Sequence, residues 1–224
     1  MRVAVLIPAL NEEEALPLVL ADLSPRALGR VVVVDNGSVD RTAEVAQAGG
    51  AEVVFEPKRG YGAACLAGLR HLSADPPDVL VFLDGDHSDD VADLPRLLAP
   101  LQAGAADLVI GDRTARAERG ALMPQQRVGN VVATTLIRAL TGLRTRDMGP
   151  FRAIRWPALM GLQMADPAFG WMVEMHMKAA RAGLRVVELP VSYRPRRGES
   201  KISGTVRGSV RAGVGMLGAC WTYR

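Results

Sequence analysis

The chain of 224 residues alternates short apolar runs with segments whose apolar residues recur at helical spacing. Apolar runs of four to eight residues, bounded by polar turns, are typical of strands buried on both faces of a parallel sheet. The pattern predicts strands near residues 2–8, 30–35, 52–55, 79–83 and 107–110, and helices near 12–22, 40–48, 62–72 and 90–101. This alternation predicts an α/β fold: a doubly wound, mainly parallel sheet with helices on both faces.

The pattern is looser after Asp112. It predicts helices near 127–141 and 171–182 and a strand near 185–189, followed by a basic, glycine-flanked segment at 194–204 that we expect to be a mobile loop closing over phosphate. In the first half, Asn11 and Glu14 resemble a helix-capping pair, and Gly49–Gly50 is expected to end the second helix.

Composition indicates one compact globular domain, since 49% of the residues are hydrophobic and 23% are charged. We expect this domain over residues 1–204, and a helix or tail over 205–224 that contacts a membrane surface or a second copy of the chain. Cys65 and Cys220 lack metal-ligand spacing and are expected to be free thiols in a reducing compartment. No signal-peptide pattern or membrane-length apolar run is seen, which favours a cytoplasmic protein, with peripheral contact at the inner membrane face left open.

Basic residues are concentrated near the end of the chain, although the formal net charge is only +3. From Arg181 onward there are nine Lys or Arg residues against Glu188 and Glu199. Such clustering favours an anionic partner, either phosphates or an acidic membrane face, but an Arg-rich composition is also typical of a GC-rich genome. No nucleic-acid partner is expected.

The residues that constrain the chemistry most are Asp84, Gly85 and Asp86, which directly follow the apolar run at 79–83. Ligands bind at the carboxyl ends of parallel strands, and two carboxylates separated by one residue point the same way in extended backbone. Hard oxygen ligands suit Mg²⁺ or Mn²⁺ together with substrate phosphates. The alternative is an Asp-rich turn that caps the following helix, for which Asp89, Asp90 and Asp93 are available.

Four further polar stretches follow predicted strands, and each pairs a small or polar turn with the start of a helix or with an arginine. That arrangement binds nucleotides and phosphates. The stretches are Ile7 to Glu12, Val34 to Thr42, Arg59 to Ala64 and Gly111 to Arg113.

Together these motifs resemble the family 2 glycosyltransferases of GT-A fold, and more closely their polyprenyl-phosphate or dolichol-phosphate mannosyltransferase-like branch. The resemblance runs from Val3 to about Gly208. It also includes later motifs at Asp147 to Ala153, Trp171 to Met175 and Tyr193 to Lys201.

The resemblance implies roles for individual residues. The nucleotide pocket would be lined by Pro8, Ala9, Asn11, Glu12 and Asp35, with Asp35 or Asn36 contacting the base or ribose. Asp84 and Asp86, with Gly85 between them, would hold the metal on the donor diphosphate. Arg113 and Arg127 would face the acceptor phosphate. Arg194, Ser200 and Lys201 would belong to the loop that closes on the phosphates.

Three positions depart from the family pattern. Asn36 stands where a second Asp is common, and Lys58–Arg59 precedes Gly60 where an Asn-containing turn is usual. Ser88 stands where some relatives have Gln, so water, Ser88 or Asp89 would supply the third metal ligand. Many relatives continue into membrane helices, whereas this sequence stops at Arg224, so a lipid carrier would be met peripherally.

The acceptor decides the mechanism that the resemblance implies. A hydroxyl acceptor needs a general base, for which Glu174 is the best candidate unless it is a buried carboxylate paired with an arginine such as Arg152. A phosphate acceptor is already ionised and needs cations instead. Arg113, Arg127, Arg194 and Lys201 are more cations than the donor requires, which favours a polyprenyl phosphate.

We therefore expect a metal-dependent inverting hexosyltransferase that uses GDP-mannose or UDP-glucose, and a homodimer is left open. Two other classes are a nucleotidyltransferase and a nucleotide-sugar-binding protein without turnover. The first would need a glycine-rich, lysine-bearing triphosphate loop, which residues 7–13 lack. The second would not require the mobile loop.

Overall fold

The computed structural model describes residues 1–23, 29–198, 215 and 218–223. Within these ranges the core is one seven-stranded sheet in the order β3-β2-β1-β4-β6-β5-β7. Its strands are β1 (Val3–Ala9), β2 (Gly29–Asp35), β3 (Glu52–Phe55), β4 (Val79–Phe82), β5 (Leu108–Asp112), β6 (Arg152–Arg155) and β7 (Val186–Pro190). All neighbouring pairs are parallel except those that include β6, which confirms the predicted mixed, mainly parallel α/β fold.

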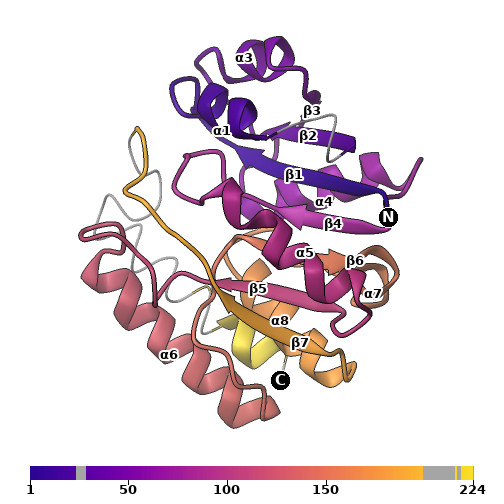
Figure 1. Ribbon diagram of the computed structural model, residues 1–224, viewed down its shortest axis with the longest axis vertical. Helices are drawn as coiled ribbons and strands as arrows, with labels where there is room; N and C mark the ends of the chain where they lie inside the picture. The colour runs from indigo at the N-terminus through magenta and orange to yellow at the C-terminus, as the bar shows by residue number, and fades with distance from the viewer. Residues whose placement is uncertain (24–28, 199–214, 216–217, 224) are drawn as a thin grey trace.

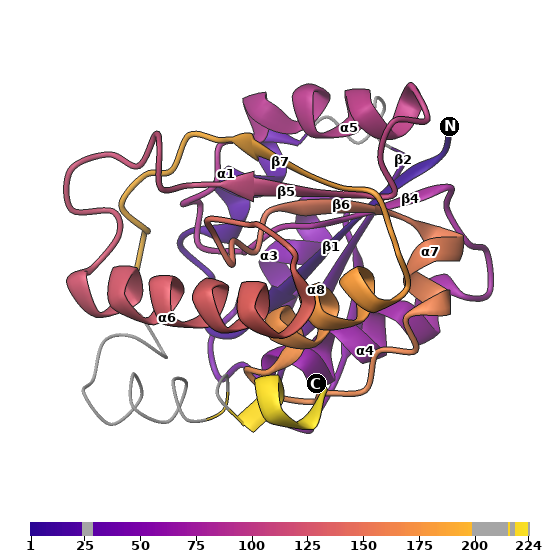
Figure 2. The same ribbon diagram turned by 90° about the horizontal axis from the view of Figure 1, so that it is seen from below.

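Helices cover both faces of this sheet, as Figures 1 and 2 show. They are α1 (Leu16–Asp22), α3 (Thr42–Ala48), α4 (Tyr61–Leu72), α5 (Leu94–Gln102), α6 (Pro124–Thr141), α7 (Trp156–Gly161) and α8 (Trp171–Arg181), with the 3-10 turn η1 (Val91–Asp93) before α5. Alternate residues of β1 point to opposite faces. Val5 and Ile7 pack with α1, α3 and α5, whereas Leu6 packs with α4, α7 and α8.

The antiparallel strand β6 determines which loops meet. Arg152 is paired with Phe82 on one side and with Ile110 on the other, so β6 begins where β4 and β5 end. The Gly111 N–H donates to the Phe151 carbonyl at 2.8 Å. The residues that precede β6 therefore reach the same sheet edge as the carboxyl ends of the parallel strands.

Four elements differ from the sequence-based expectation. Helix α1 begins at Leu16 without a side-chain cap, because Asn11 takes a left-handed conformation (φ 54°) and residues 11–14 form a loop. Helix α6 begins at Pro124, because proline is favoured in the first helical turn. Strand β6 and helix α7 were not predicted. Asp90 does cap a short helical turn, since its side chain accepts from Ala92 N at 3.1 Å.

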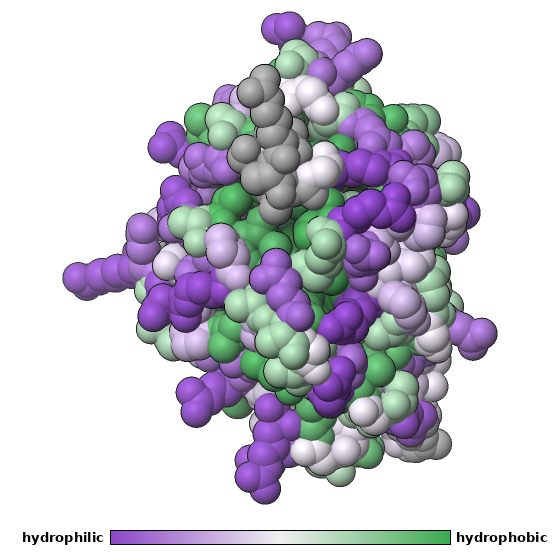
Figure 3. Space-filling model, turned by 45° about the vertical axis from the view of Figure 1, so that its right-hand side comes forward, coloured by the Kyte–Doolittle hydropathy of each residue, from purple (hydrophilic) through white to green (hydrophobic). Residues whose placement is uncertain are grey.

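Helix α6 lies along one side of the molecule (Figures 1 and 2). Its inner residues Ala133 and Ile137 pack with α8 and with Ala219 and Cys220, which belong to a helical segment at 218–222. Cys65 and Cys220 are both free, as expected. No helix among the described residues has the length and apolarity needed to cross a membrane. On the face drawn in Figure 3, hydrophilic side chains protrude between small apolar areas.

Candidate functional site

The loops after β1 and β2 form one wall of the site and are joined by side chains. The Asn11 N–H donates to Ser38 Oγ at 3.0 Å, and Val39 N–H donates to Asn11 Oδ1 at 2.9 Å. Asp35 Oδ1 accepts from Ser38 N at 2.9 Å, which holds the Asp35 carboxylate in the turn. Pro8 and Ala9 form the end of β1 beside this turn. The residues of these two loops that were expected to line the nucleotide pocket therefore lie together.

The Asn36 side chain holds the neighbouring 56–60 loop in place. Its amide nitrogen donates to the carbonyls of Glu56 and Lys58, and its oxygen accepts from Gly60 N at 2.8 Å. The side chain is buried and fully used in holding the 56–60 loop. Of the two residues considered for the base or ribose, Asp35 is therefore the better placed.

The Asp84–Gly85–Asp86 turn packs against the loop after β1. A Cβ built on Gly85 would meet Ile7 Cγ2 at 3.4 Å and Glu12 Cγ at 3.7 Å, so this backbone lies directly on the first loop. Asp86 Oδ1 accepts from the backbone N–H of Ser88 at 3.0 Å and from its hydroxyl at 2.5 Å. Ser88 thus orients the carboxylate of Asp86 and leaves Asp86 Oδ2 on the side of the basic segment that follows Tyr193.

A third carboxylate, Asp89, lies next to this pair. Both of its oxygens are buried, and neither has a hydrogen-bond partner in the described part of the chain. Burial and the neighbouring charge of Asp86 raise the pKa of Asp84 above its ordinary range, and burial and Asp84 raise the pKa of Asp89. Crowded, desolvated carboxylates are unfavourable unless a cation offsets them.

These carboxylates fit a divalent cation. Asp84 and Asp86 would bind it as hard oxygen ligands, and substrate phosphate oxygens and water would complete its coordination. The described residues hold no cluster of three or more His, Cys, Asp or Glu side chains arranged to bind a metal unaided. A site of this kind would therefore bind the ion together with its phosphate substrate.

Arg196 bridges the first loop and the Asp84–Asp86 turn. One guanidinium nitrogen lies 2.8 Å from Glu12 Oε1, and another lies 3.4 Å from Asp86 Oδ2. The neighbouring backbone is fixed as well, because Arg197 N–H donates to the Asp86 carbonyl at 3.0 Å. A cation from the late basic segment thus lies directly over the acidic turn.

Arg194 pairs with a different carboxylate from Arg196. Its guanidinium pairs with Asp90 at 3.0 Å, and its backbone N–H donates to the Ser88 carbonyl at 2.8 Å. Arg196, which the sequence interpretation did not select, takes the place beside Asp86. The other two expected members of this segment, Ser200 and Lys201, lie outside the described residues.

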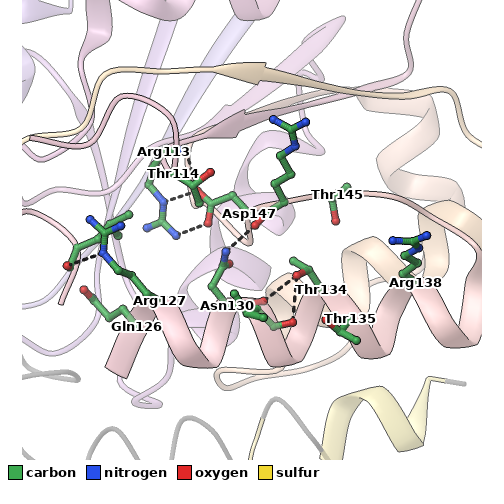
Figure 4. A pocket seen from close by; sticks show the side chains of 13 residues that line it. Arg113, Thr114, Gln126, Arg127, Asn130, Thr134, Thr135, Arg138, Thr145 and Asp147 are labelled. Atoms are coloured by element: carbon green, nitrogen blue, oxygen red, sulfur yellow. Dashed lines mark hydrogen bonds and ion pairs between the residues drawn. The ribbon is translucent and has the colours of Figure 1, made fainter. Parts of the chain in front are cut away.

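Arg113 and Arg127 line one pocket of about 440 Å³ between α6, the end of β5 and the segment before β6 (Figure 4). Arg113 makes a two-point pair with Asp147, with Nε at 2.7 Å from Oδ2 and Nη2 at 2.8 Å from Oδ1. It also lies over the Tyr193 ring, 5.0 Å from the centroid. The pocket therefore has a rigidly held cation at one end, with Arg127 nearby on α6.

Electrostatics connect this pocket with the acidic turn. Burial opposes ionisation of Asp147, but the charge and hydrogen bonds of Arg113 outweigh it and lower the pKa of Asp147. Burial and Asp86 raise the pKa of Asp84, and the charge of Arg113 offsets part of that rise. Arg113 thus acts on both carboxylates, and the pocket adjoins the candidate metal ligands.

Glu174 is not brought to either part of the site. Its fully buried carboxylate accepts from the backbone N–H groups of Ala165 and Asp166, each at 2.8 Å, and from Lys178 Nζ at 2.7 Å. The suggested pairing with Arg152 is wrong, because Arg152 donates to the Gly149 carbonyl instead. Glu174 holds the 165–166 turn in this structure.

Two contributors to the site, Arg196 and Asp147, were not given these roles in the sequence interpretation, whereas Asp89 was named there as a possible third metal ligand. Arg196 could have been found from its position in the basic segment, two residues before Gly198. Asp147 was noted only as the first residue of the later motif at 147–153, and its pairing with Arg113 depends on the antiparallel β6. No local pattern indicates that pairing.

The sequence matches the family described as Glycosyl transferase family 2 over residues 4–161. The chain belongs to this family. A family 2 match together with relatives named as glycosyltransferases and mannosyltransferases confirms the expected class, a hexosyltransferase. A glycosyltransferase of Mycobacterium tuberculosis is 48% identical over 212 residues, which cover 94% of each chain.

A second relative is named for a lipid acceptor. The undecaprenyl-phosphate mannosyltransferase of Micrococcus luteus is 35% identical over 229 residues, which cover 96% of this chain and 93% of that one. Among solved structures, glucosyl-3-phosphoglycerate synthase of Mycobacterium tuberculosis in complex with phosphoglyceric acid superposes with a TM-score of 0.74. It is 26% identical and is matched over 98% of this chain and 80% of its own.

Proposed function

We propose that this glycosyltransferase moves a hexose from GDP-mannose or UDP-glucose to a polyprenyl phosphate, with inversion at the anomeric carbon and with Mg²⁺ or Mn²⁺ as cofactor. The observation that carries the acceptor class is the pocket lined by Arg113 and Arg127, because Asp147 fixes the Arg113 guanidinium through two of its five N–H donors and the others are left for phosphate oxygens. The relative named undecaprenyl-phosphate mannosyltransferase supports the same class.

The donor would lie across the loops after β1, β2 and β4. Asp35 would contact the base or ribose, and residues 8–12 would form the wall of the nucleotide pocket. Asp84 and Asp86 would hold a divalent cation, which offsets the negative charge that develops on the departing diphosphate. Arg196 is in position to contact the same phosphates, since it already spans Glu12 and Asp86.

In the transfer step, an oxygen of the acceptor phosphate forms a bond to the anomeric carbon. The bond from that carbon to the diphosphate breaks, and its electron pair leaves with the nucleoside diphosphate. An ionised phosphate has no proton to lose, so no general base is required. This agrees with the buried, fully hydrogen-bonded state of Glu174.

A transfer assay tests this proposal. Radiolabelled GDP-mannose and UDP-glucose would each be supplied with Mn²⁺ and a short polyprenyl phosphate in detergent, and label would be counted in the organic phase. We expect label there from one donor, and the same product from Glu174→Gln, whose folding is checked by thermal melting. Dependence on Glu174 with product only in the aqueous phase would reject the phosphate acceptor.

The second candidate is transfer to a hydroxyl group of a small soluble acceptor, with Glu174 as base. The similarity to a synthase crystallised with phosphoglyceric acid favours it, because that compound is small and anionic. The same assay separates the two, since a soluble product stays in the aqueous phase.

A further inference from the structure

The outer face of α6 carries an exposed apolar stripe. Val128, Val131 and Val132 are 64%, 62% and 43% exposed, and Met123 and Leu140 near the two ends of the helix are 40% and 46% exposed. Residues 128, 131 and 132 project from one side of a helix because they are three or four positions apart. Nothing in the described part of the chain covers this stripe, whereas the opposite side of α6 packs with α8.

The charged residues from 119 to 146, the segment that carries this stripe, have a single sign. From Arg119 to Arg146 the chain contains five arginines and no Asp, Glu or Lys. Arg119 and Arg144 are exposed on the segments directly before and after α6, and Arg138 is exposed on the helix itself. Exposed apolar residues bordered by arginines, without acidic residues, are typical of a helix that lies on an anionic bilayer.

The stripe also borders the candidate acceptor pocket. Val131 belongs to both, since it is exposed on the helix and lines the pocket with Arg127 and Arg138. Figure 4 shows α6 running along the full length of the pocket, with Arg127 and Arg138 at separate positions along it. A surface pressed against α6 would therefore meet the pocket mouth.

We propose that the outer face of α6 is the surface by which this protein docks on an anionic membrane. This deepens the proposed function, since it assigns the face that brings the phosphate pocket to a lipid acceptor. The valines would enter the boundary between headgroups and acyl chains, and the flanking arginines would contact lipid phosphates. Burial of the apolar stripe and neutralisation of the arginines act together.

Vesicle flotation tests the docking surface. The full chain would be mixed with phosphatidylcholine vesicles that contain or lack phosphatidylglycerol. We expect flotation with the anionic vesicles, and Val128→Asp should weaken it by about tenfold or more, because a charge replaces a side chain that would be buried in lipid. The matched control is Val39→Asp, because Val39 is 84% exposed on a loop away from α6 and should bind as the wild type does.

Two further measurements separate the contribution of the arginines from that of the valines, and docking from transfer. Arg119→Gln with Arg144→Gln should weaken binding to anionic vesicles by roughly fivefold per arginine and leave binding to neutral vesicles unchanged. Val128 does not line the pocket, so Val128→Asp should still transfer hexose to a short polyprenyl phosphate in detergent.

The outcomes distinguish this inference from the proposed function. Flotation that is unchanged in Val128→Asp, or absent for the wild type while lipid-phosphate transfer persists, overturns docking and leaves the proposed function standing. Flotation that depends on α6 while transfer goes only to soluble compounds upholds docking and rejects the polyprenyl acceptor. Loss of a dimer in Val128→Asp with flotation unchanged would assign the stripe to a second copy of the chain and overturn the proposal.

Discussion

At the scale of single residues, the site is built by polar side chains that fix one another. Arg113 is held by two contacts to Asp147, and it lies over the Tyr193 ring. Asp86 is oriented by Ser88. Preoriented charges of this kind contribute more to binding than freely rotating ones, because less side-chain entropy is lost when the ligand arrives.

Arg113→Lys tests this orientation. Lysine keeps the charge but cannot make the two-point contact with Asp147, so its ammonium would not be held toward the pocket. We expect the KM for polyprenyl phosphate to rise by about tenfold or more, while the KM for the nucleotide sugar changes little. The measurement is steady-state kinetics with each substrate varied, and Arg119→Lys is the control at an exposed position. An unchanged acceptor KM in Arg113→Lys would remove Arg113 from acceptor recognition.

At the scale of elements, the order of strands determines what meets at the sheet edge. Strand β7 is parallel to β5, and the two begin side by side where Arg185 meets Asp107. Two guanidinium nitrogens of Arg185 lie 2.9 and 2.7 Å from the Asp107 oxygens, and its backbone N–H donates to the same carboxylate at 3.0 Å. These hydrogen bonds to Arg185 lower the pKa of Asp107 from 3.8 to about 2.

Asp107→Asn should therefore lower the free energy of unfolding at neutral pH. Because the folded-state pKa of Asp107 is below its ordinary value, its contribution is present above about pH 4 and is lost as the pH falls toward 2. We expect a loss of about 1 kcal/mol at pH 7, reduced from the full linkage value because Arg185 is largely exposed. Urea titrations between pH 7 and pH 2.5 measure the difference, which should shrink with acid.

The matched control is Asp75→Asn. Asp75 pairs with Arg2 at 2.8 Å, but both side chains are more than 60% exposed, so solvent screens the pair. We expect a change below about 0.5 kcal/mol. Equal losses of unfolding free energy in the two variants would show that the Asp107–Arg185 pair stabilises the fold no more than an exposed ion pair does.

Much of the fold follows from the sequence, and the exceptions share a cause. Strands β1, β2 and β4 are continuous apolar runs and were predicted nearly to the residue. Strand β6 has only four residues with arginine at each end, and its place between β4 and β5 depends on contacts distant in sequence. The side chain of Arg152 is fully buried despite its charge, which composition would not predict.

The residues of the candidate site also fall into those selected from the sequence and those recognised only in the structure. Asp84, Asp86 and Arg113 were selected because each follows a recognisable strand, and Arg127, which lines the same pocket as Arg113, was selected from the resemblance to the family. Asp147 and Arg196 act through partners that only the folded chain brings near them. Motif residues are thus accessible from the sequence, whereas the residues that orient them are not.

At the scale of the whole molecule, an early loop and a late segment of the chain meet over the acidic turn. Arg196 pairs with Glu12 across 184 positions of sequence, and also lies beside Asp86. The loop after β1 and the basic segment after Tyr193 are therefore joined by charges. A diphosphate and a cation bound there would rearrange them. Ligand binding at this junction should stabilise the entire domain.

A thermal-shift experiment tests that coupling and needs no turnover. A ligand at about 100 times its Kd adds about 2.7 kcal/mol to the stability of the folded state. For a domain of this size we expect Mn²⁺ with GDP or UDP to raise Tm by roughly 5–10 °C. The Mn²⁺-dependent part should disappear in Asp86→Ala.

Asp78→Ala is the control, because Asp78 lies just before β4, at the opposite end of the strand from Asp86. This variant should keep the full ligand-dependent shift even if its own Tm is lower. A Mn²⁺-dependent shift that survives in Asp86→Ala would place the cation elsewhere.

The hydrogen bond between Gly111 and Phe151 closes the base of the segment that contains Arg113, α6 and Asp147. That segment leaves the sheet at the end of β5 and returns at the start of the adjacent β6, so it is an insertion with both ends at one point. In evolution, a segment of this kind can be lengthened, shortened or exchanged while the parallel strands β1, β2 and β4 stay intact. Under the proposed function, exchanging residues 113–151 between relatives should change acceptor preference and leave donor preference as it was.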